Sequence, residues 1–179
     1  MDQAAGDLEA ADQGWQCTCG SAHTGLAYSF AAPAPDAWAA LRWWQRGRSS
    51  QLADEVCILR GSDFFIRGLI EIPVLDGDQP VFSWNVWSSL SRENFERAGA
   101  LWDSAERVDE PPYFGWMAVE LVPAYPTTTN LKLNVHTREP GRRPLLEVEP
   151  TDHPLAVEQR EGITVERVRH LNEAMLHRR

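Results

Sequence analysis

Two cysteines and a histidine lie close together near the start of the chain, in the stretch WQCTCGSAHTG at residues 15–25. Thiolate and imidazole groups are the ligands that zinc prefers, and a zinc ion in a structural site takes four ligands in a tetrahedral arrangement. Cys17 and Cys19 are one residue apart, so they can share an ion only where the chain bends tightly. Gly20 provides the backbone freedom for such a bend, and His23 follows within reach of it. The spacing therefore indicates part of a metal site.

A fourth ligand has to come from elsewhere in the sequence. Cys57 is the first candidate, and His136 and His153 are the alternatives. Four protein ligands would make a structural zinc site, whereas three ligands and a water molecule would make a catalytic one. Cysteines buried near the first strand, beside an exposed histidine, would need no metal at all. The predicted cofactor is one structural zinc ion, bound by Cys17, Cys19, His23 and Cys57.

A second group of residues that could perform chemistry comes from the strand pattern. Along residues 129–137 apolar and polar side chains alternate, which places His136 on the polar face of a strand. If neighbouring strands bring Glu71, Glu147 or Glu149 beside this histidine, the imidazole and the carboxylates could perform acid–base chemistry. That arrangement would suit a metal-dependent or His/carboxylate-based hydrolase. An antiparallel sheet that shows one polar face to water explains the same pattern without any activity.

The stretch EPTDHPLAVEQREG at residues 149–162 combines acidic residues with a histidine at the start of an expected helix. Thr151 or Asp152 is the expected N-cap, with Pro154 in the first turn. An imidazole near a capped helix N-terminus could help to bind an anion. A well-capped amphipathic helix explains the same residues without a ligand.

Hydrophobic patterns with the periods of strands and helices predict the elements that would position these residues. The expected strands comprise residues 26–30, 55–61, 64–74, 81–90, 113–121, 129–137 and 143–150. The expected helices comprise residues 34–45, 91–104, 153–162 and 164–179. Short connections favour antiparallel pairing of consecutive strands. The predicted fold class is α+β, with a mainly antiparallel sheet of about five to six strands, helices packed on one face and two helices at the C-terminus.

The chain has 179 residues, which is enough for one domain with a sizeable core. Residues 1–14 are small, polar and acidic, and we expect them to form a disordered leader before a single α+β domain at residues 15–179. A formal net charge of −9 disfavours nucleic-acid binding, because a phosphate backbone would be repelled. The same charge favours a basic protein partner, although solubility alone also explains it.

Several classes of protein lack support in the sequence. No run of about 18 apolar residues is present, which argues against a membrane-spanning helix. The first residues have neither the basic nor the apolar region of a signal peptide, and an odd number of cysteines argues against a disulfide framework. The expected location is cytoplasmic. The motifs of P-loop, Rossmann, α/β-hydrolase and zinc-protease sites are also absent from the sequence.

The order of several longer motifs resembles that of a known bacterial family. The motifs are CG-x-x-H, CILRGSDFFIRGLIEIPV, FSWNVWSSLSRENFER, EPPYFGW, NLKLNVHT and EPTDHPLAVEQREGI. On these motifs the chain is similar, from about Trp15 to His177, to domain-of-unknown-function family 2199. The resemblance implies a single cytoplasmic bacterial domain, and it implies no particular activity.

The resemblance also bears on the cysteines. Family members resemble C-x2-C-G-x2-H in this region, so Cys19, Gly20 and His23 match the pattern, whereas Cys17 is displaced by one residue. A cysteine at the position of Cys57 is also typical of the family, and the resemblance therefore implies the same four zinc ligands. The overall expectation is a non-enzymatic binding or accessory domain with a structural zinc site. A hydrolase of unknown substrate is the alternative.

Overall fold

The structure, a computed structural model, describes residues 14–17, 20–47 and 49–176 of the chain. Of the predicted leader at residues 1–14, only Gly14 is described, so the leader and the domain boundary stay predictions. Within the described ranges, no helix combines the length and the apolar character needed to cross a lipid bilayer.

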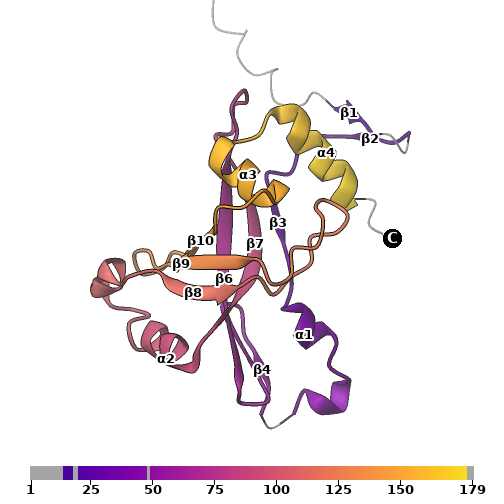
Figure 1. Cartoon of the computed structure of the whole chain (residues 1–179). Helices are drawn as coiled ribbons and strands as arrows, with labels where there is room; N and C mark the ends of the chain where they lie inside the picture. Colours follow the sequence, from indigo (N-terminus) through magenta and orange to yellow (C-terminus); the bar gives the residue numbers. More distant parts are fainter. Residues whose placement is uncertain (1–13, 18–19, 48, 177–179) are drawn as a thin grey trace, which may run out of the picture.

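Two long strands, β6 (Asp63–Pro73) and β7 (Val81–Leu90), pair antiparallel along their whole length and run through the middle of the molecule (Figure 1). Side chains alternate between the two faces of a strand. The isoleucines of β6 are buried on one face, as the sequence pattern predicts, while Arg67 and Glu71 lie on the opposite face. The core therefore sits on one side of the long strands, and a mixed polar face sits on the other.

Eight strands form one sheet among the described residues, in the order β3-β7-β6-β10-β9-β8, with β5 beside β6 and β4 beside β5. The other six strands are β3 (Ser29–Ala31), β4 (Gln51–Leu52), β5 (Val56–Leu59), β8 (Tyr113–Trp116), β9 (Lys132–His136) and β10 (Leu145–Val148). The α+β class is confirmed, but the sheet has more strands than predicted and is mixed. The pairs β3–β7 and β10–β6 are parallel. Their connections are long, so the rule that short connections give antiparallel pairs does not apply to them.

The sheet curls until its last strand meets β7 again. Met117, directly after β8, forms an isolated bridge with Ser88 of β7, and the N–H of Ala118 donates to the carbonyl oxygen of Trp87 at 2.9 Å. Gly115 lies where these segments meet, and a Cβ atom there would come within 2.2 Å of Ser88 Oγ. Only glycine fits this close approach. Strands β6 to β10 therefore form a closed ring of strands.

The predicted hairpin at the start of β6 is present, although its turn is displaced. Arg60 and Gly61 occupy the centre of the turn with φ angles of 53° and 67°, and the N–H of Ser62 donates to the carbonyl oxygen of Leu59 at 3.0 Å. Two consecutive residues with positive φ are typical of the type I′ turn, whose twist matches that of the flanking strands. The predicted strands at residues 55–61 and 64–74 place the turn on Ser62-Asp63, two residues later than the structure does.

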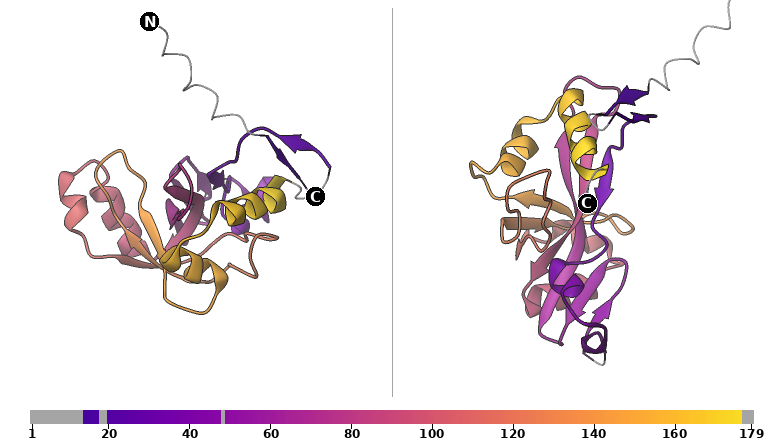
Figure 2. Two further views of the ribbon diagram at one scale, coloured as in Figure 1. Left: turned by 90° about the horizontal axis from the view of Figure 1, so that it is seen from above. Right: turned by 90° about the vertical axis from the view of Figure 1, so that its right-hand side faces the viewer.

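The described residues contain the α-helices α1 (Asp36–Ala39), α2 (Arg92–Ala100), α3 (Pro154–Glu161) and α4 (Val165–Leu176), and the 3₁₀ helices η1 (Trp43–Gln45) and η2 (Ala105–Asp109). The two predicted C-terminal helices are confirmed. They lie over one end of the long strands (Figures 1 and 2), and Leu155 and Leu171 are buried in the same core as Trp84. The helix predicted at 34–45 is instead split into α1 and η1, because the N–H of Arg42 bonds to the side chain of Gln45.

The N-cap predicted for α3 is wrong. Helix α2, which lies within the predicted helix at residues 91–104, is capped by Ser91, whose Oγ accepts a hydrogen bond from the N–H of Asn94 at 3.1 Å. Helix α3 is capped by His153 and not by Thr151 or Asp152, because the His153 ring nitrogen Nδ1 accepts from the N–H of Leu155 at 3.2 Å. The imidazole that was expected to help bind an anion here therefore serves as the cap.

Candidate functional site

The N-terminal hairpin contains two of the predicted zinc ligands. β1 (Trp15–Gln16) pairs antiparallel with β2 (Ala22–His23) beside α4 (Figure 1). In this register Cys17 and His23 are diagonal neighbours on one face of the hairpin. Cys19 lies outside the described residues. The structure thus brings together two of the predicted ligands and does not describe the third.

Cys57 lies in a different part of the molecule. It belongs to β5, whose neighbour β4 is at the opposite end of Figure 1 from the hairpin, and it is fully buried. Its partner in β6 is Phe65, so roughly 26 Å of strand separate it from Pro73 at the far end of β6. Burial raises the pKa of the Cys57 thiol to about 11, which disfavours the thiolate form that zinc binds. The structure does not bring Cys57 to the hairpin.

No group of three or more histidine, cysteine, aspartate or glutamate side chains within the described ranges is placed to hold a metal ion. The two alternative fourth ligands belong to other elements than the hairpin. His136 is the last residue of β9, and His153 is the N-cap of α3. Because Cys19 is outside the described ranges, zinc binding by the hairpin stays a prediction.

His136 lies beside Glu147 on the polar face of the sheet. The Nε2 atom of His136 is 2.8 Å from Glu147 Oε2, and both residues border a hollow of about 520 Å³ together with Glu71. Glu149 instead pairs with Lys132 at 3.6 Å. We call the hollow the histidine groove, and it is lined by Glu71, Pro73, Val81, His136, Leu145, Glu147, Val148, Pro150, Gln159 and Arg160.

A second hollow adjoins this groove and carries a different set of charges. Its volume is about 510 Å³, and Glu71 borders both hollows. Four arginines and two glutamates line it, which gives a local excess of positive charge in a chain whose net charge is −9. We call it the arginine pocket, and it is lined by Glu55, Leu69, Glu71, Trp102, Arg107, Arg138, Gly141, Arg142 and Arg143.

Arg107 reaches the arginine pocket from η2, in the connection between α2 and β8. Its guanidinium group lies over the ring of Trp102, 4.9 Å from the ring centroid, and Nη1 donates to the Trp102 carbonyl oxygen at 2.7 Å. Thr137 Oγ1, at the end of β9, donates to the carbonyl oxygen of Arg107. These contacts leave Arg107 only 2% exposed.

The far end of the same connection is fixed by Glu110. Its carboxylate accepts two hydrogen bonds from Arg97, at 2.6 and 3.0 Å, and one from the hydroxyl of Tyr113 at 2.8 Å. Hydrogen bonds from these two side chains lower the pKa of Glu110. Burial and the bond to Glu110 raise the pKa of Tyr113 to about 12. The connection that carries Arg107 is therefore held at both ends.

Arg138 and Arg143 reach the pocket from the loop between β9 and β10. Arg138 Nε donates to the carbonyl oxygen of Arg143 at 2.7 Å, which closes the loop, and Arg138 Nη1 donates to Glu71 Oε1 at 2.8 Å. Arg143 donates two hydrogen bonds to the carboxylate of Glu55, from Nη2 to Oε1 at 2.6 Å and from Nε to Oε2 at 2.8 Å. Gly141, with a φ angle of 84°, provides the turn that both arginines need.

Arg107 differs from these two arginines because, in the part of the chain that the structure describes, it has no carboxylate within ion-pair distance. Buried charges in proteins are normally paired, since removing a charge from water is unfavourable. Arg138 and Arg143 each have a glutamate partner, so much of the positive excess in the pocket belongs to Arg107. An anion that enters the pocket would complete the pairing.

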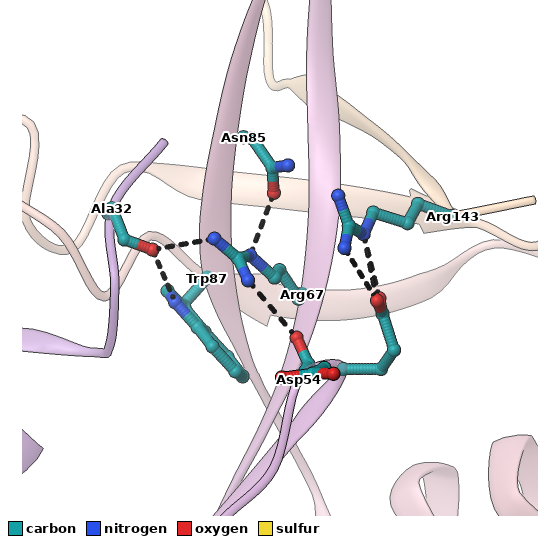
Figure 3. Close-up of polar contacts among 7 residues, drawn as sticks. Ala32, Asp54, Arg67, Asn85, Trp87 and Arg143 are labelled. Atoms are coloured by element: carbon teal, nitrogen blue, oxygen red, sulfur yellow. Dashed lines mark hydrogen bonds and ion pairs between the residues drawn. The ribbon is translucent and has the colours of Figure 1, made fainter. Parts of the chain in front are cut away.

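Positive charge continues from the pocket onto the neighbouring face of β6, where Figure 3 shows Arg67 among its partners. Arg67 Nε donates to Asn85 Oδ1 at 2.9 Å, and Nη2 donates to the Ala32 carbonyl oxygen at 3.1 Å. Nη1 donates to the Asp54 carbonyl oxygen at 3.3 Å. Burial lowers the pKa of Arg67, and the positive charge of Arg143 lowers it further. These three acceptors are uncharged oxygens. They therefore do not neutralise the positive charge of Arg67, which adds to the positive charge of the neighbouring pocket.

Sequence analysis did not identify the arginine pocket. One signal was available, because Arg138, Arg142 and Arg143 fall within six residues, in or next to the connection between the predicted strands at residues 129–137 and 143–150. No comparable signal marks Arg107, a single arginine after a helix, because its burial depends on contacts with residues that are distant in the sequence.

The sequence matches the protein family described as "Uncharacterized protein conserved in bacteria (DUF2199)" over residues 16–163. The chain belongs to the DUF2199 family. The resemblance inferred from the motifs is thereby confirmed. The DUF2199 match includes every residue that lines the arginine pocket and the histidine groove, and it ends before α4. Comparisons of this DUF2199 member with curated proteins and with solved structures gave no match.

Proposed function

We propose that this DUF2199 protein is a binding domain, and that its arginine pocket binds a small molecule with a carboxylate or phosphate group. The observation that carries the proposal is Arg107, a residue that is 2% exposed, borders the pocket and has no carboxylate partner among the described residues. A bound anion would supply the missing negative charge.

The chemistry of the pocket suits such a ligand. A planar guanidinium group presents several N–H donors to the oxygens of a carboxylate or phosphate, and among the described residues Arg107 engages only Nη1 in a hydrogen bond. Leu69 and Trp102 supply apolar walls, and a volume of about 510 Å³ is in the range of metabolite-sized sites.

The acidic net charge of the chain does not oppose this binding. Charges on the protein surface are screened over about 8 Å at physiological ionic strength, so the local excess of arginines decides the potential inside the pocket. The repulsion expected from the net charge of −9 applies to an extended polyanion such as nucleic acid, and not to a small ligand that the pocket encloses.

The proposal is tested by titration calorimetry at low salt, with inorganic phosphate, ethyl phosphate and hexanoate as probes. We expect at least one probe to bind to the wild type and to lose about tenfold or more in affinity in the variant Arg107→Met, because one charge-assisted contact contributes on the order of 1.5–3 kcal/mol. The exposed pocket residue Arg142 offers a variant without a folding risk, and Arg142→Gln should weaken binding two- to fivefold.

The matched control is Lys132→Met, which removes one positive charge from the sheet surface outside the pocket. Equal losses in Lys132→Met and Arg107→Met would mean that the attraction is diffuse and the pocket is not the site. Absence of binding by all three probes in the wild type would overturn the proposal. Melting temperatures with and without probe provide the second measurement, because a ligand of the folded state raises the melting temperature.

The other expectations for this chain stay predictions. The hydrolase alternative draws on the contact between His136 and Glu147, and it requires hydrolysis of p-nitrophenyl acetate or phosphate that His136→Gln abolishes. A basic protein partner would be detected by pull-down at low salt, and zinc in the hairpin by elemental analysis. We favour binding because the buried group without a carboxylate partner among the described residues is a guanidinium, which binds anions and is no nucleophile.

A further inference from the structure

We infer that the ligand of the arginine pocket also carries an ammonium group, which binds between Glu71 and Glu147 in the histidine groove. This inference rests on the proposed function and extends it from an anion to a zwitterion whose two charges are separated. It follows from the order of charges along the two adjoining hollows.

Glu71 borders both hollows, and one of its carboxylate oxygens has no hydrogen bond with a described residue. Its Oε1 accepts a hydrogen bond from Arg138 Nη1 at 2.8 Å, on the side of the arginine pocket. Its Oε2 has no hydrogen bond with a described residue, and the side chain is 34% exposed. One oxygen therefore faces the pocket arginine, and the other is available to a donor in the groove.

Glu147 has the same arrangement on the neighbouring strand. Its Oε2 contacts His136 Nε2, and its Oε1 has no hydrogen bond within the described residues. Glu71 and Glu147 each stand two residues beyond the parallel pair Leu69 and Leu145, so they project from the same face of adjacent strands. Both border the histidine groove. Two carboxylate oxygens without protein partners thus line one hollow.

A primary ammonium group matches this pair, because it has three N–H donors and a positive charge. Arg160, a residue of α3 that also borders the groove, is bonded to its own helix and to the segment before it, where Nη1 donates to the carbonyl oxygens of Ala156 at 3.0 Å and Thr151 at 3.3 Å. The groove therefore favours a cation and the arginine pocket favours an anion. The ion pair of Arg138 and Glu71 marks the boundary between the two.

The boundary also sets the length of the ligand. An anion that contacts Arg107 and Arg138 in the pocket and an ammonium group beside Glu71 lie on opposite sides of the ion pair of Arg138 and Glu71. With contacts of about 2.8–3.0 Å on each side of that pair, the two charges are roughly 6–9 Å apart. A linear chain of about five methylene carbons between the carboxylate group and the amine spans this distance. We therefore expect 6-aminohexanoate to fit better than its shorter and longer homologues.

The experiment compares matched probes that differ only in the amino group, by titration calorimetry at low salt. The pairs are 6-aminohexanoate with hexanoate, and 4-aminobutyl phosphate with butyl phosphate, which separates a carboxylate ligand from a phosphate ligand. We expect the amino compound of at least one pair to bind about tenfold more tightly to the wild type. The series from 3-aminopropanoate to 8-aminooctanoate should show an optimum in length.

The variant Glu147→Gln separates this inference from the proposed function. It keeps the shape of a half-exposed side chain and should remove most of the gain from the amino group, while the affinity for hexanoate or butyl phosphate stays unchanged. Equal binding of the amino and the plain compounds by the wild type would overturn the zwitterion and leave the anion site intact. Failure of every anion to bind would overturn both. An unchanged melting temperature confirms that the variant is folded.

Discussion

Two clusters of buried charge in this molecule use arginine in opposite ways. Under α3 and α4, Arg167 Nε donates to Glu158 Oε1 at 2.7 Å, and the hydroxyl of Tyr125 donates to Glu158 Oε2. The Arg167 guanidinium also lies over the Tyr125 ring, 5.4 Å from its centroid. Both oxygens of Glu158 are therefore engaged. In the arginine pocket, Arg107 is more deeply buried than Arg167 and has no carboxylate partner among the described residues.

The difference shows that pairing, and not the number of arginines, separates a structural cluster from a candidate site. A closed cluster balances its charges within the protein, so removing any member leaves another member unsatisfied. An open cluster leaves one charge to be balanced from outside, so removing that charge should harm ligand binding more than folding. Three changes test this contrast on the folded protein without ligand.

The largest effect is expected for Glu158→Gln in the closed cluster. The change leaves Arg167 without its negative partner and weakens the acceptor of Tyr125, and we expect the free energy of unfolding to fall by about 2 kcal/mol in urea denaturation. The control Glu166→Gln breaks an exposed pair with Arg169 and should lower it by about 0.5 kcal/mol or less. Equal losses would erase the distinction between the closed cluster and an ordinary surface pair.

Alkaline pH should weaken the same cluster through Tyr125. Burial raises the pKa of Tyr125, and the negative charge of Glu158 raises it further, so the folded protein keeps the proton while an unfolded tyrosine loses it near pH 10. The contribution to stability is complete below pH 10 and is lost as the pH rises above that value. Cys57 and Tyr113, with pKa values raised to about 11 and about 12, add losses of the same sign.

The variant Tyr125→Phe isolates this contribution. Between pH 8 and pH 11 its free energy of unfolding should decrease by about 1 kcal/mol less than that of the wild type, because one pKa unit corresponds to about 1.4 kcal/mol. Urea denaturation at the two pH values measures the difference. Parallel losses in both proteins would show that Tyr125 ionises as readily in the folded state as in the unfolded one.

The smallest effect on stability is expected for Arg107→Met in the open cluster. Methionine keeps an unbranched stem over Trp102, and the loss of the cation–π contact is offset by the removal of an unpaired buried charge. The free energy of unfolding without ligand should stay within about 1 kcal/mol of the wild type. A loss as large as that of Glu158→Gln would show that Arg107 is a structural residue and would contradict the contrast drawn here.

The sequence predicted the elements with strong local patterns and missed contacts that depend on distant residues. The alternation along β6 and the helical spacing of α4 were sufficient to predict these two elements, because each pattern arises from one buried face. Strands were predicted near β3 and β10, but their parallel pairing with β7 and β6 was not foreseen, since these partners lie across long connections. The cap of α3 was expected at Thr151 or Asp152 because short polar side chains usually cap helices, whereas the His153 ring fills that role.

The candidate site shows the same limit. His136 beside Glu147 could be anticipated, because two alternating strands that pair must bring their polar faces together. Arg107 could not, because nothing in its neighbourhood in the sequence shows that η2 folds against Thr137 and Trp102. The spacing of Cys17, Cys19 and His23 suggested that a fourth ligand was needed, and Cys57 was the candidate. The sequence does not show that the strand of Cys57 and the N-terminal hairpin lie at opposite ends of the molecule.

The closed ring of strands affects how the protein behaves at high concentration. Exposed edge strands act as templates for added strands and promote aggregation. Beyond β8, the bridge from Met117 to Ser88 occupies what would otherwise be an open edge. The outer strands that remain among the described residues, β3 and β4, have three and two residues. Although Phe114 and Trp116 expose their rings on β8, the backbone therefore offers little length for a second chain to extend the sheet.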